Sequence, residues 1–417
     1  MAETDTPQGG RHLFVLRDGR RVGTLSLVDG TPGFAYAADW PAWSGARPLS
    51  VALPLRREPF GQRATLAYFD GILPEETARR GAARALGIAD QNSFALLDAL
   101  GGDVAGAISL VAPEAMAGYL ADAVQRTRTT HGTALSETEL ADLIERLPQR
   151  PLLAGETGAP RLSLAGAQTK VPLVRLEGGG LRLPEDGEPS THILKPEPPA
   201  LPGLVANEAY VMGLAGAAGL PVAGVEVLVA GGQRGLLVER YDRSPAGARL
   251  HQEDACQALG LLSADKYEPG LRDLFGLIRA HSTRVARDVL TLFDAVVFNI
   301  AVGNADAHAK NFSLLQDGSG VQLAPLYDLI CTAAYPQVDV KFAMRVAGRA
   351  TLDEIKPDDW VRLSEPTGLA SAGLPRRARQ MVERIQVAHA LTPVPPGADA
   401  VAELVRERLD RLLRLLP

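Results

Sequence analysis

The chain has 417 residues, of which 46% are hydrophobic and 22% charged, so its composition is that of a globular protein and its length predicts two or three domains. The formal net charge of −6 at pH 7 gives no overall basic character, which argues against direct nucleic-acid binding as the main role. No signal-peptide core begins the chain and no long apolar run occurs in it, so we expect a cytoplasmic protein without a membrane-spanning helix.

Both cysteines, Cys256 and Cys331, lack the neighbours that a zinc site requires. We predict that they are small buried hydrophobic residues rather than a disulfide. The three tryptophans, Trp40, Trp43 and Trp360, are scattered along the chain and are interpreted as packing residues.

Residues 1–115 are predicted to form a small α+β domain with a structural or interactive role. Alternating residues between 12 and 30 carry two Asp-Gly pairs, which indicates a small antiparallel sheet. Helices are predicted from Leu73 to about Ile88 and over 93–100, followed by a strand over 103–111.

Residues 116–160 are predicted to be a helical connector and linker. Ser136 and Glu139 match a capping box before the apolar-periodic stretch that follows. The stretch 151–160 is rich in Gly and Pro and indicates a linker.

Residues 161–250 alternate strand-like segments with Gly-rich turns around one helix, predicted over 207–219. A loop of small residues, 163–170, lies between two predicted strands, where backbone N–H groups could approach phosphate oxygens closely. It lacks the Walker A pattern, and an ordinary structural turn would look the same.

The same region offers a lysine and an edge for adenine. Lys195 ends a predicted strand and could reach phosphates, although a surface lysine is the common alternative. Glu208 is predicted to open the helix and to pair with Lys195. A later strand runs into Glu239, Arg240 and Tyr241, which could present backbone groups and an aromatic ring to adenine.

Residues 251–417 are predicted to be mainly helical, beginning with the block at His251 and Gln252 and ending in an amphipathic helix. The exception is 294–330, where an apolar helix leads into a polar loop and then a hairpin.

That loop holds Asp306 and Asn311 at a spacing which suits phosphoryl transfer. The aspartate can orient and deprotonate an acceptor hydroxyl while the asparagine ligates Mg²⁺. After the hairpin, Asp328 stands where a second metal-binding carboxylate is expected. The spacing alone is weak, because a solvated turn produces it often. The joint order of small-residue loop, lysine, glutamate, hinge, catalytic loop and final aspartate is the stronger signal.

Several blocks resemble one known family, the HipA-type serine/threonine kinases, which are the toxins of bacterial HipBA toxin–antitoxin pairs. They are SLAGAQTK, THILKPE, NEAY, LLVERYDR, HQEDACQALGL, KYE, NADAHAKNFSLL and LAPLYDLICTA. The resemblance runs from about residue 12 to the C-terminal helices. It implies a two-lobed, protein-kinase-like α+β core, with 161–250 as the N-lobe and 251–417 as a helical C-lobe.

The resemblance also implies roles for residues. Asp306 would be the catalytic base, Asn311 and Asp328 the Mg²⁺ ligands, and Ser163 the site of a silencing autophosphorylation. The residues implied to line ATP are Ala165, Gly166, Ala167, Gln168, Thr169, Lys170, Lys195, Glu239, Arg240, Tyr241, His308, Ala309, Lys310, Asn311, Tyr327 and Asp328. For His308 we favour a positional role over acid–base chemistry.

The partners implied are a HipB-like helix-turn-helix antitoxin dimer, DNA mainly through the antitoxin complex, and a protein substrate. The substrate of characterised members is an aminoacyl-tRNA synthetase, the glutamyl enzyme above all, and its phosphorylation stops translation and growth. Two other functions stay open: a corepressor that keeps the fold without turnover, and a small-molecule phosphotransferase.

Overall fold

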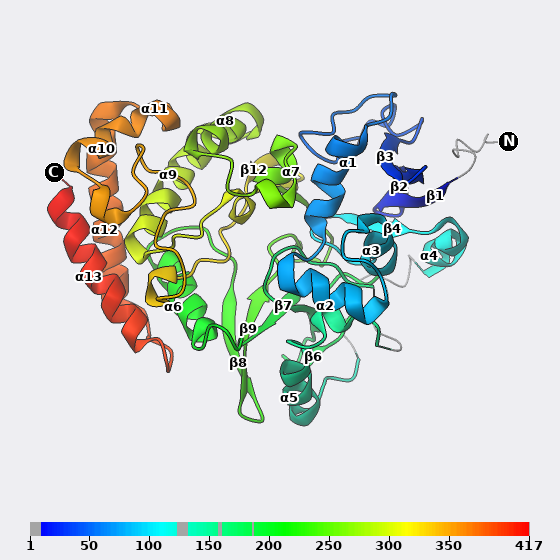
Figure 1. The fold of residues 1–417 in the computed structure, drawn as a ribbon, viewed down its shortest axis with the longest axis horizontal. Coiled ribbons are helices and arrows are strands. Elements are labelled where there is room, and N and C mark those ends of the chain that lie inside the picture. The colour runs from blue at the N-terminus through cyan, green and yellow to red at the C-terminus, as the bar shows by residue number, and fades with distance from the viewer. Residues whose placement is uncertain (1–9, 123–131, 157–160, 186, 417) are drawn as a thin grey trace. The chain divides into compact units, whose positions relative to one another are not determined.

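The structure is a computed structural model that describes residues 10–122, 132–156, 161–185 and 187–416. The chain forms two compact units (Figure 1). The N-terminal unit comprises residues 1–196, 230–233 and 242–263, and the C-terminal unit comprises 197–229, 234–241 and 264–417. The four-part division predicted from the sequence stays a prediction.

The N-terminal unit begins with a four-stranded antiparallel sheet in the order β3-β2-β1-β4. Its strands are β1 (Arg11–Arg17), β2 (Arg20–Val28), β3 (Thr31–Tyr36) and β4 (Ile108–Val111). Both Asp-Gly pairs form the two-residue turns, with Asp18 and Gly19 at φ 51° and 74°. Such tight hairpins need positive φ at both central residues, which explains why the sequence predicted this sheet correctly.

Helices α1 (Gln62–Phe69), α2 (Glu76–Leu86) and α3 (Ser93–Leu100) complete the first core (Figure 1). Helix α1 packs on β3 and helix α3 on β4. The core between them is strongly aromatic and includes Phe34, Phe60, Tyr68 and Phe69. The predicted helix over 93–100 is confirmed at both ends.

In the connector, α4 (Met116–Asp122) and α5 (Glu137–Arg146) confirm the helical prediction for the part that the structure describes. The Ser136 hydroxyl accepts a hydrogen bond from the Glu139 N–H, and the Glu139 carboxylate accepts one from the Ser136 N–H at 2.8 Å. The predicted capping box is therefore present. Residues 123–131 and 157–160 of the predicted connector lie outside the described residues.

The rest of the N-terminal unit contains β5 (Val171–Arg175), β6 (Leu181–Arg182), β7 (His192–Pro196), β10 (His251–Asp254) and α7 (Ala255–Leu259). Strand β5 pairs antiparallel with both β6 and β7.

Two predictions are wrong in this region. The segment before the small-residue loop is not a strand, because it forms only an isolated bridge between Leu162 and Asp103. The block at His251 begins as strand β10, not as a helix: Asp254, the N-cap of α7, itself has extended backbone at φ −77° and ψ 165°, so the helix begins only at Ala255.

The C-terminal unit is mainly helical, as predicted (Figure 1). Its helices are α6 (Leu204–Ala217), α8 (Leu271–His281), α9 (Val285–Val302), α10 (Pro357–Arg362), α11 (Ser364–Thr367), α12 (Leu374–Leu391) and α13 (Asp399–Leu415). Its strands are β8 (Val225–Ala230) and β9 (Gln233–Glu239), apart from Ala230 and Gln233 at their ends, and β11 (Ser313–Asp317) and β12 (Gly320–Leu323). Helix α9 packs against α8, α12 and α13. Its last ten residues are all buried.

One boundary in this unit differs from the prediction. Helix α6 begins at Leu204, so Glu208 is its fifth residue and does not open it. The start is set by Gly203, whose φ of 81° ends the preceding turn, and by Glu197, whose carboxylate accepts the Leu204 N–H at 2.7 Å. Neither feature has a local sequence signature.

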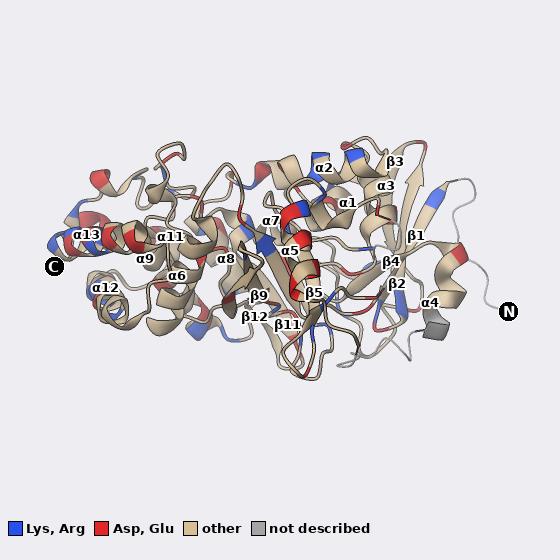
Figure 2. Cartoon of the chain, turned by 90° about the horizontal axis from the view of Figure 1, so that it is seen from below, with Lys and Arg blue, Asp and Glu red and all other residues tan. Residues whose placement is uncertain are grey.

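Both cysteines are buried and free, which confirms the prediction for them. Trp40 and Trp360 are fully buried, whereas Trp43 is 39% exposed and lies under the Arg20 guanidinium. Charges of both signs alternate along α13 (Figure 2). Among the described residues, no helix is both long and apolar enough to cross a bilayer.

Candidate active site

The predicted catalytic loop begins where α9 ends. Gly303 stops the helix with a φ of 76°, and its N–H donates to the carbonyls of Asn299 and Ile300. The Asn304 side chain donates to Asn299 Oδ1 at 2.8 Å and accepts the Asp306 N–H at 3.2 Å. The Thr332 hydroxyl accepts the Ala305 N–H at 2.8 Å. These bonds fix the backbone on both sides of Asp306.

Asp306 itself presents an exposed side chain. Its Oδ1 accepts a hydrogen bond of 2.8 Å from the Tyr267 hydroxyl. The Tyr267 ring meets the His308 ring edge-on, with centroids 5.2 Å apart. His308 is buried and its N–H donates to the Asp306 carbonyl at 2.8 Å. The loop therefore holds an accessible carboxylate on a braced backbone, which is the geometry that a general base needs.

The segments that carry Asn311 and Asp328 are linked by a hydrogen bond of Tyr327. Asn311 ends a short 3₁₀ turn over Ala309–Asn311, which directly follows His308. The Tyr327 hydroxyl donates to the Lys310 carbonyl at 2.6 Å and lies 2.6 Å from the Ser313 hydroxyl. The first bond links the Lys310 backbone, next to Asn311, to the side chain of Tyr327, next to Asp328.

The backbone around Asp328 is fixed by α6 and the segment after it. The Leu326 N–H donates to the Pro221 carbonyl at 2.8 Å, on one side of Asp328. On the other side, the Asn207 amide accepts the Cys331 N–H at 2.8 Å and donates to the Cys331 carbonyl at 3.0 Å. Asp328 has a φ of 53°, which is uncommon for a residue other than glycine.

This donor set fits a magnesium ion that is held partly by phosphate. Carboxylate and amide oxygens are the ligands that Mg²⁺ prefers, and it commonly uses only one or two protein carboxylates. No group of three or more His, Cys, Asp or Glu side chains that could hold a metal occurs in the described parts of the chain. Asn311 and Asp328 thus suit a metal bound together with its nucleotide.

The predicted hinge also contributes to this side of the site. The Glu239 N–H donates to the Gly224 carbonyl at 2.8 Å, and its side chain is exposed. Arg240 is buried. The Tyr241 ring stacks on the Tyr327 ring with centroids 5.5 Å apart and planes 22° apart. Two residues predicted from distant segments to line a nucleotide therefore lie against each other.

The predicted phosphate loop belongs to the N-terminal unit. Residues 165–169 are half-buried, and Lys170 is buried. Gly166 has a φ of 105°, and its carbonyl accepts the Glu75 N–H at 3.0 Å. The Lys170 ammonium donates to the Ala165 carbonyl at 2.6 Å, and a Cβ at Gly166 would lie only 2.7 Å from it. A glycine is therefore required where the loop closes on its own lysine.

Ser163 stands at the start of this loop and has no exposed surface. Its hydroxyl donates to the Ile72 carbonyl at 2.8 Å. Lys195 is buried on β7 in the same unit, while Glu208 is buried on α6 in the C-terminal unit. The pairing of Lys195 with Glu208 stays a prediction.

Three residues of this site were not predicted: Tyr267, Thr332 and Asn207. Each acts through a hydrogen bond to a residue far along the chain, such as the bond between Tyr267 and Asp306. No local spacing reports such a partner. The only available signal was their presence in the resembling blocks KYE, LAPLYDLICTA and NEAY.

Comparison with known proteins gives two family matches. Residues 13–111 match the HipA N-terminal domain, and residues 162–391 match the HipA-like C-terminal domain.

Relatives match over nearly the whole chain. A putative kinase of Sinorhizobium fredii, Y4mE, is 47% identical over 96% of this chain and 93% of its own length. The serine/threonine-protein kinase toxin HipA of Shewanella oneidensis is 30% identical over 94% of this chain and 92% of its own length.

Among solved structures, a complex of HipA, HipB and operator DNA from Shewanella oneidensis matches with a TM-score of 0.80. The identity is 28%, and the match covers 96% of this chain and 97% of that one. Family models, relatives and fold agree, so the chain belongs to the HipA-like family of serine/threonine kinase toxins and has its two-lobed kinase fold.

Proposed function

We propose that this protein is an ATP- and Mg²⁺-dependent serine/threonine protein kinase and the toxin of a type II toxin–antitoxin pair. One observation carries the proposal: the exposed Asp306 carboxylate lies on a braced loop whose far end, at Lys310 and Asn311, is fastened through Tyr327 to Asp328. The proposed base and the two proposed metal ligands would therefore be carried by hydrogen-bonded segments, which suits phosphoryl transfer.

In this proposal Asp306 orients the acceptor hydroxyl and takes its proton as the oxygen attacks phosphorus. Asn311 and Asp328 would hold Mg²⁺, which would neutralise charge on the phosphates. The loop 165–170 and Lys195 would contact the phosphates, and Glu239, Arg240 and Tyr241 the adenine side. His308 would keep the catalytic loop in shape, since it is buried and packed against Tyr267.

The proposed partners follow from family membership and from the related complex. The Shewanella structure contains HipB and operator DNA, which supports a HipB-like antitoxin dimer for this chain and DNA contact through that complex. The proposed substrate is an aminoacyl-tRNA synthetase, with the glutamyl enzyme as the first candidate, and its phosphorylation would stop translation. Transfer to Ser163 would silence the kinase itself.

The test is incubation of purified protein with Mg²⁺ and labelled ATP, with phosphosite mapping and a panel of synthetases as acceptors. Asp306→Ala should lower turnover by ~10²–10⁴-fold, the usual contribution of a general base. Asp339→Ala is the control, because Asp339 is an exposed aspartate in another loop of the same unit. Its turnover should equal that of the unchanged protein.

The outcomes separate the alternatives. Label on Ser163 and on a synthetase supports the kinase toxin. ATP binding without label on any protein, but with label on a small molecule, would replace it with a small-molecule phosphotransferase. ATP binding without any transfer, in protein shown to be unphosphorylated, would leave the corepressor.

A further inference from the structure

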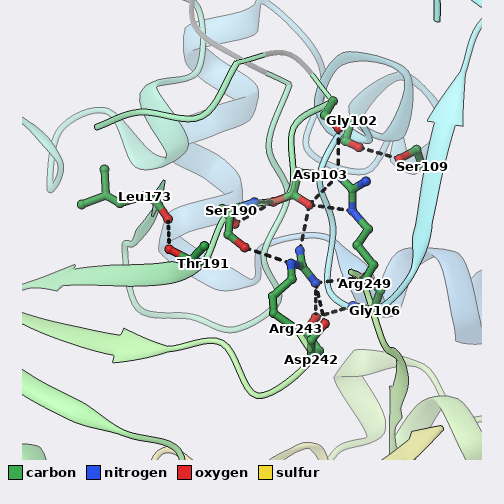
Figure 3. Close-up of polar contacts among 11 residues, drawn as sticks. Gly102, Asp103, Gly106, Ser109, Leu173, Ser190, Thr191, Asp242, Arg243 and Arg249 are labelled. Atoms are coloured by element: carbon green, nitrogen blue, oxygen red, sulfur yellow. Dashed lines mark hydrogen bonds and ion pairs between the residues drawn. The ribbon is translucent and has the colours of Figure 1, made fainter. Parts of the chain in front are cut away.

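A buried carboxylate lies outside the site described above, immediately after α3. Asp103 has no exposed surface, and its side chain accepts hydrogen bonds from three residues (Figure 3). Oδ2 accepts the Ser190 hydroxyl at 2.7 Å. Oδ1 accepts the Arg243 guanidinium at 2.9 Å and the Arg249 guanidinium at 3.0 Å and 3.2 Å. All four residues belong to the N-terminal unit.

The cluster contains acids as well as arginines. Asp242 supplies a second carboxylate, 3.1 Å from Arg243, and accepts the Gly106 N–H at 2.7 Å. Two acids and two arginines therefore meet where the side chains of Asp103 and Arg243 are only 1% and 4% exposed. A buried carboxylate is tolerated only when it is paired and hydrogen-bonded, so removal of one charge weakens the whole cluster.

The backbone of the same residue holds the start of the phosphate loop. The Asp103 N–H donates to the Arg161 carbonyl at 2.9 Å, and the Ser163 N–H donates to the Asp103 carbonyl at 3.0 Å. Arg161 adds hydrogen bonds to the carbonyls of Asp98 and Leu110. Asp103 is therefore hydrogen-bonded to Ser163 through its backbone and to Arg243 and Arg249 through its side chain.

Ser163 cannot be modified while it is docked in this way. Its hydroxyl is fully buried against the Ile72 carbonyl, and a phosphoserine carries close to two negative charges. In the transfer, the bond between the γ-phosphorus and its bridging oxygen breaks and a bond to Ser163 Oγ forms. The hydroxyl proton passes to the catalytic base, and ADP leaves. The loop must leave its docked position before this step.

We propose that Asp103 is the positioning residue that keeps Ser163 and its loop docked, and that its pairing with Arg243 and Arg249 sets how often the loop is released. The functional part of this inference rests on the proposed self-phosphorylation at Ser163. The docking part rests on the hydrogen bonds alone. Arg243 stands two positions after the predicted hinge residue Tyr241, so the cluster also ties the loop to the chain that leaves the hinge.

The experiment compares Asp103→Asn with the unchanged protein by hydrogen–deuterium exchange over residues 161–170, without ATP. Weakened hydrogen bonds to a charged group should speed exchange in this segment by about ten- to hundredfold. Glu188→Gln is the matched control. Glu188 is also buried and forms a two-point pair with Arg182 at 2.7 Å and 2.6 Å. In Glu188→Gln, the exchange rate over 161–170 should equal that of the unchanged protein.

The second readout is the rate of phosphate incorporation at Ser163 with Mg²⁺ and ATP. It should rise in Asp103→Asn by a similar factor and stay constant in Glu188→Gln. Unchanged exchange in a folded Asp103→Asn protein, or equal acceleration in Glu188→Gln, overturns the inference. Faster exchange without any phosphate on Ser163 upholds the docking role and counts against self-phosphorylation instead.

If Asp103→Asn does not fold, Arg249→Gln is the second variant. It disturbs the cluster less, because Arg243 still pairs with Asp103. It removes the two hydrogen bonds from Arg249 to Oδ1. Exchange over 161–170 should be several-fold faster than in the unchanged protein. Exchange at the unchanged rate in Arg249→Gln would overturn the inference.

Discussion

At the scale of single residues, the Asp306 carboxylate already carries one hydrogen bond, from Tyr267 to Oδ1 at 2.8 Å. That bond fixes the rotation of the carboxylate and leaves Oδ2 for the hydroxyl of an acceptor. Tyr267 is 53% exposed, and its contacts include the ring of His308 and this bond. We predict that it acts by positioning Asp306.

Tyr267→Phe should therefore lower kcat about tenfold, the value of one hydrogen bond to a charged group. The KM for ATP should stay the same, because the phenylalanine ring keeps the contact with His308. Steady-state kinetics with a protein acceptor measures both constants. A change in KM for ATP with constant kcat would assign Tyr267 to nucleotide binding instead.

Glu253 is a second residue of interest, because its buried surroundings change its pKa and so make the stability of the fold depend on pH. It is buried, and its carboxylate accepts the Ser50 hydroxyl at 2.5 Å and the Val51 N–H at 3.0 Å. Burial is the largest influence and raises the pKa of Glu253 to about 7. The folded protein then holds this proton more tightly than the unfolded chain does. The contribution of Glu253 to the free energy of unfolding is fully present below the pKa of the unfolded chain. It is lost as the pH rises toward 7.

Glu253→Gln should remove this pH dependence. Relative to the variant, the unchanged protein should lose about 3 kcal/mol of unfolding free energy between pH 4.5 and pH 7. Urea denaturation at a series of pH values measures the difference. His251, whose pKa burial lowers to about 4, is present in both proteins and cancels in the comparison. A constant difference across this range would show that Glu253 titrates normally.

At the scale of elements, the sequence predicted best where the determinants are local. The Asp-Gly hairpins, the capping box at Ser136 and the helix over 93–100 each depend on residues within a few positions of one another. The errors concern segments whose state depends on distant partners. Leu162 finds its bridge partner at Asp103, and the start of α6 is set by Gly203 and Glu197.

The end of α9 supplies a test at this scale. Gly303 has a φ of 76°, and a Cβ there would lie 2.8 Å from the Arg408 side chain and 2.9 Å from Ala333. Gly303→Ala should cost about 1–2 kcal/mol from the left-handed backbone alone and should also lower activity, because the catalytic loop starts there. Unfolding and kinase assays measure the two effects.

Gly276→Ala is the control for this substitution. Gly276 lies inside α8, and nothing stands within 4 Å of an added Cβ. The change should stabilise the protein by up to about 1 kcal/mol, since alanine is the better helix former. Equal effects of the two substitutions would show that the backbone at Gly303 is not decisive.

At the scale of the whole molecule, the residues predicted for the site belong to both units. The small-residue loop and Lys195 belong to the N-terminal unit, and Asp306, Asn311 and Asp328 to the C-terminal unit. The sequence could predict their order and their chemistry, because these are properties of the chain. It could not predict the hydrogen bond from the Tyr327 hydroxyl to the Lys310 carbonyl or the one from the Ser163 N–H to the Asp103 carbonyl. Such contacts exist only after folding.

Nucleotide binding should stabilise the folded chain as a whole. At a free MgATP concentration 100 times the Kd, mass action predicts about 2.7 kcal/mol of added stability. In Asp328→Asn the part of the ATP-induced rise in Tm that depends on Mg²⁺ should disappear. Thermal unfolding with ATP, with and without Mg²⁺, measures it. An undiminished Mg²⁺ effect in the variant would remove Asp328 from the metal site.

The left-handed backbone at Asp328 decides which mutations this position can tolerate. With φ at 53°, this position accepts glycine or asparagine without strain, whereas most other side chains would disturb it. Both residues are one base change away from aspartate in the genetic code. A single mutation can therefore remove the carboxylate that we predict to bind metal and still encode a folded chain that keeps its other binding surfaces.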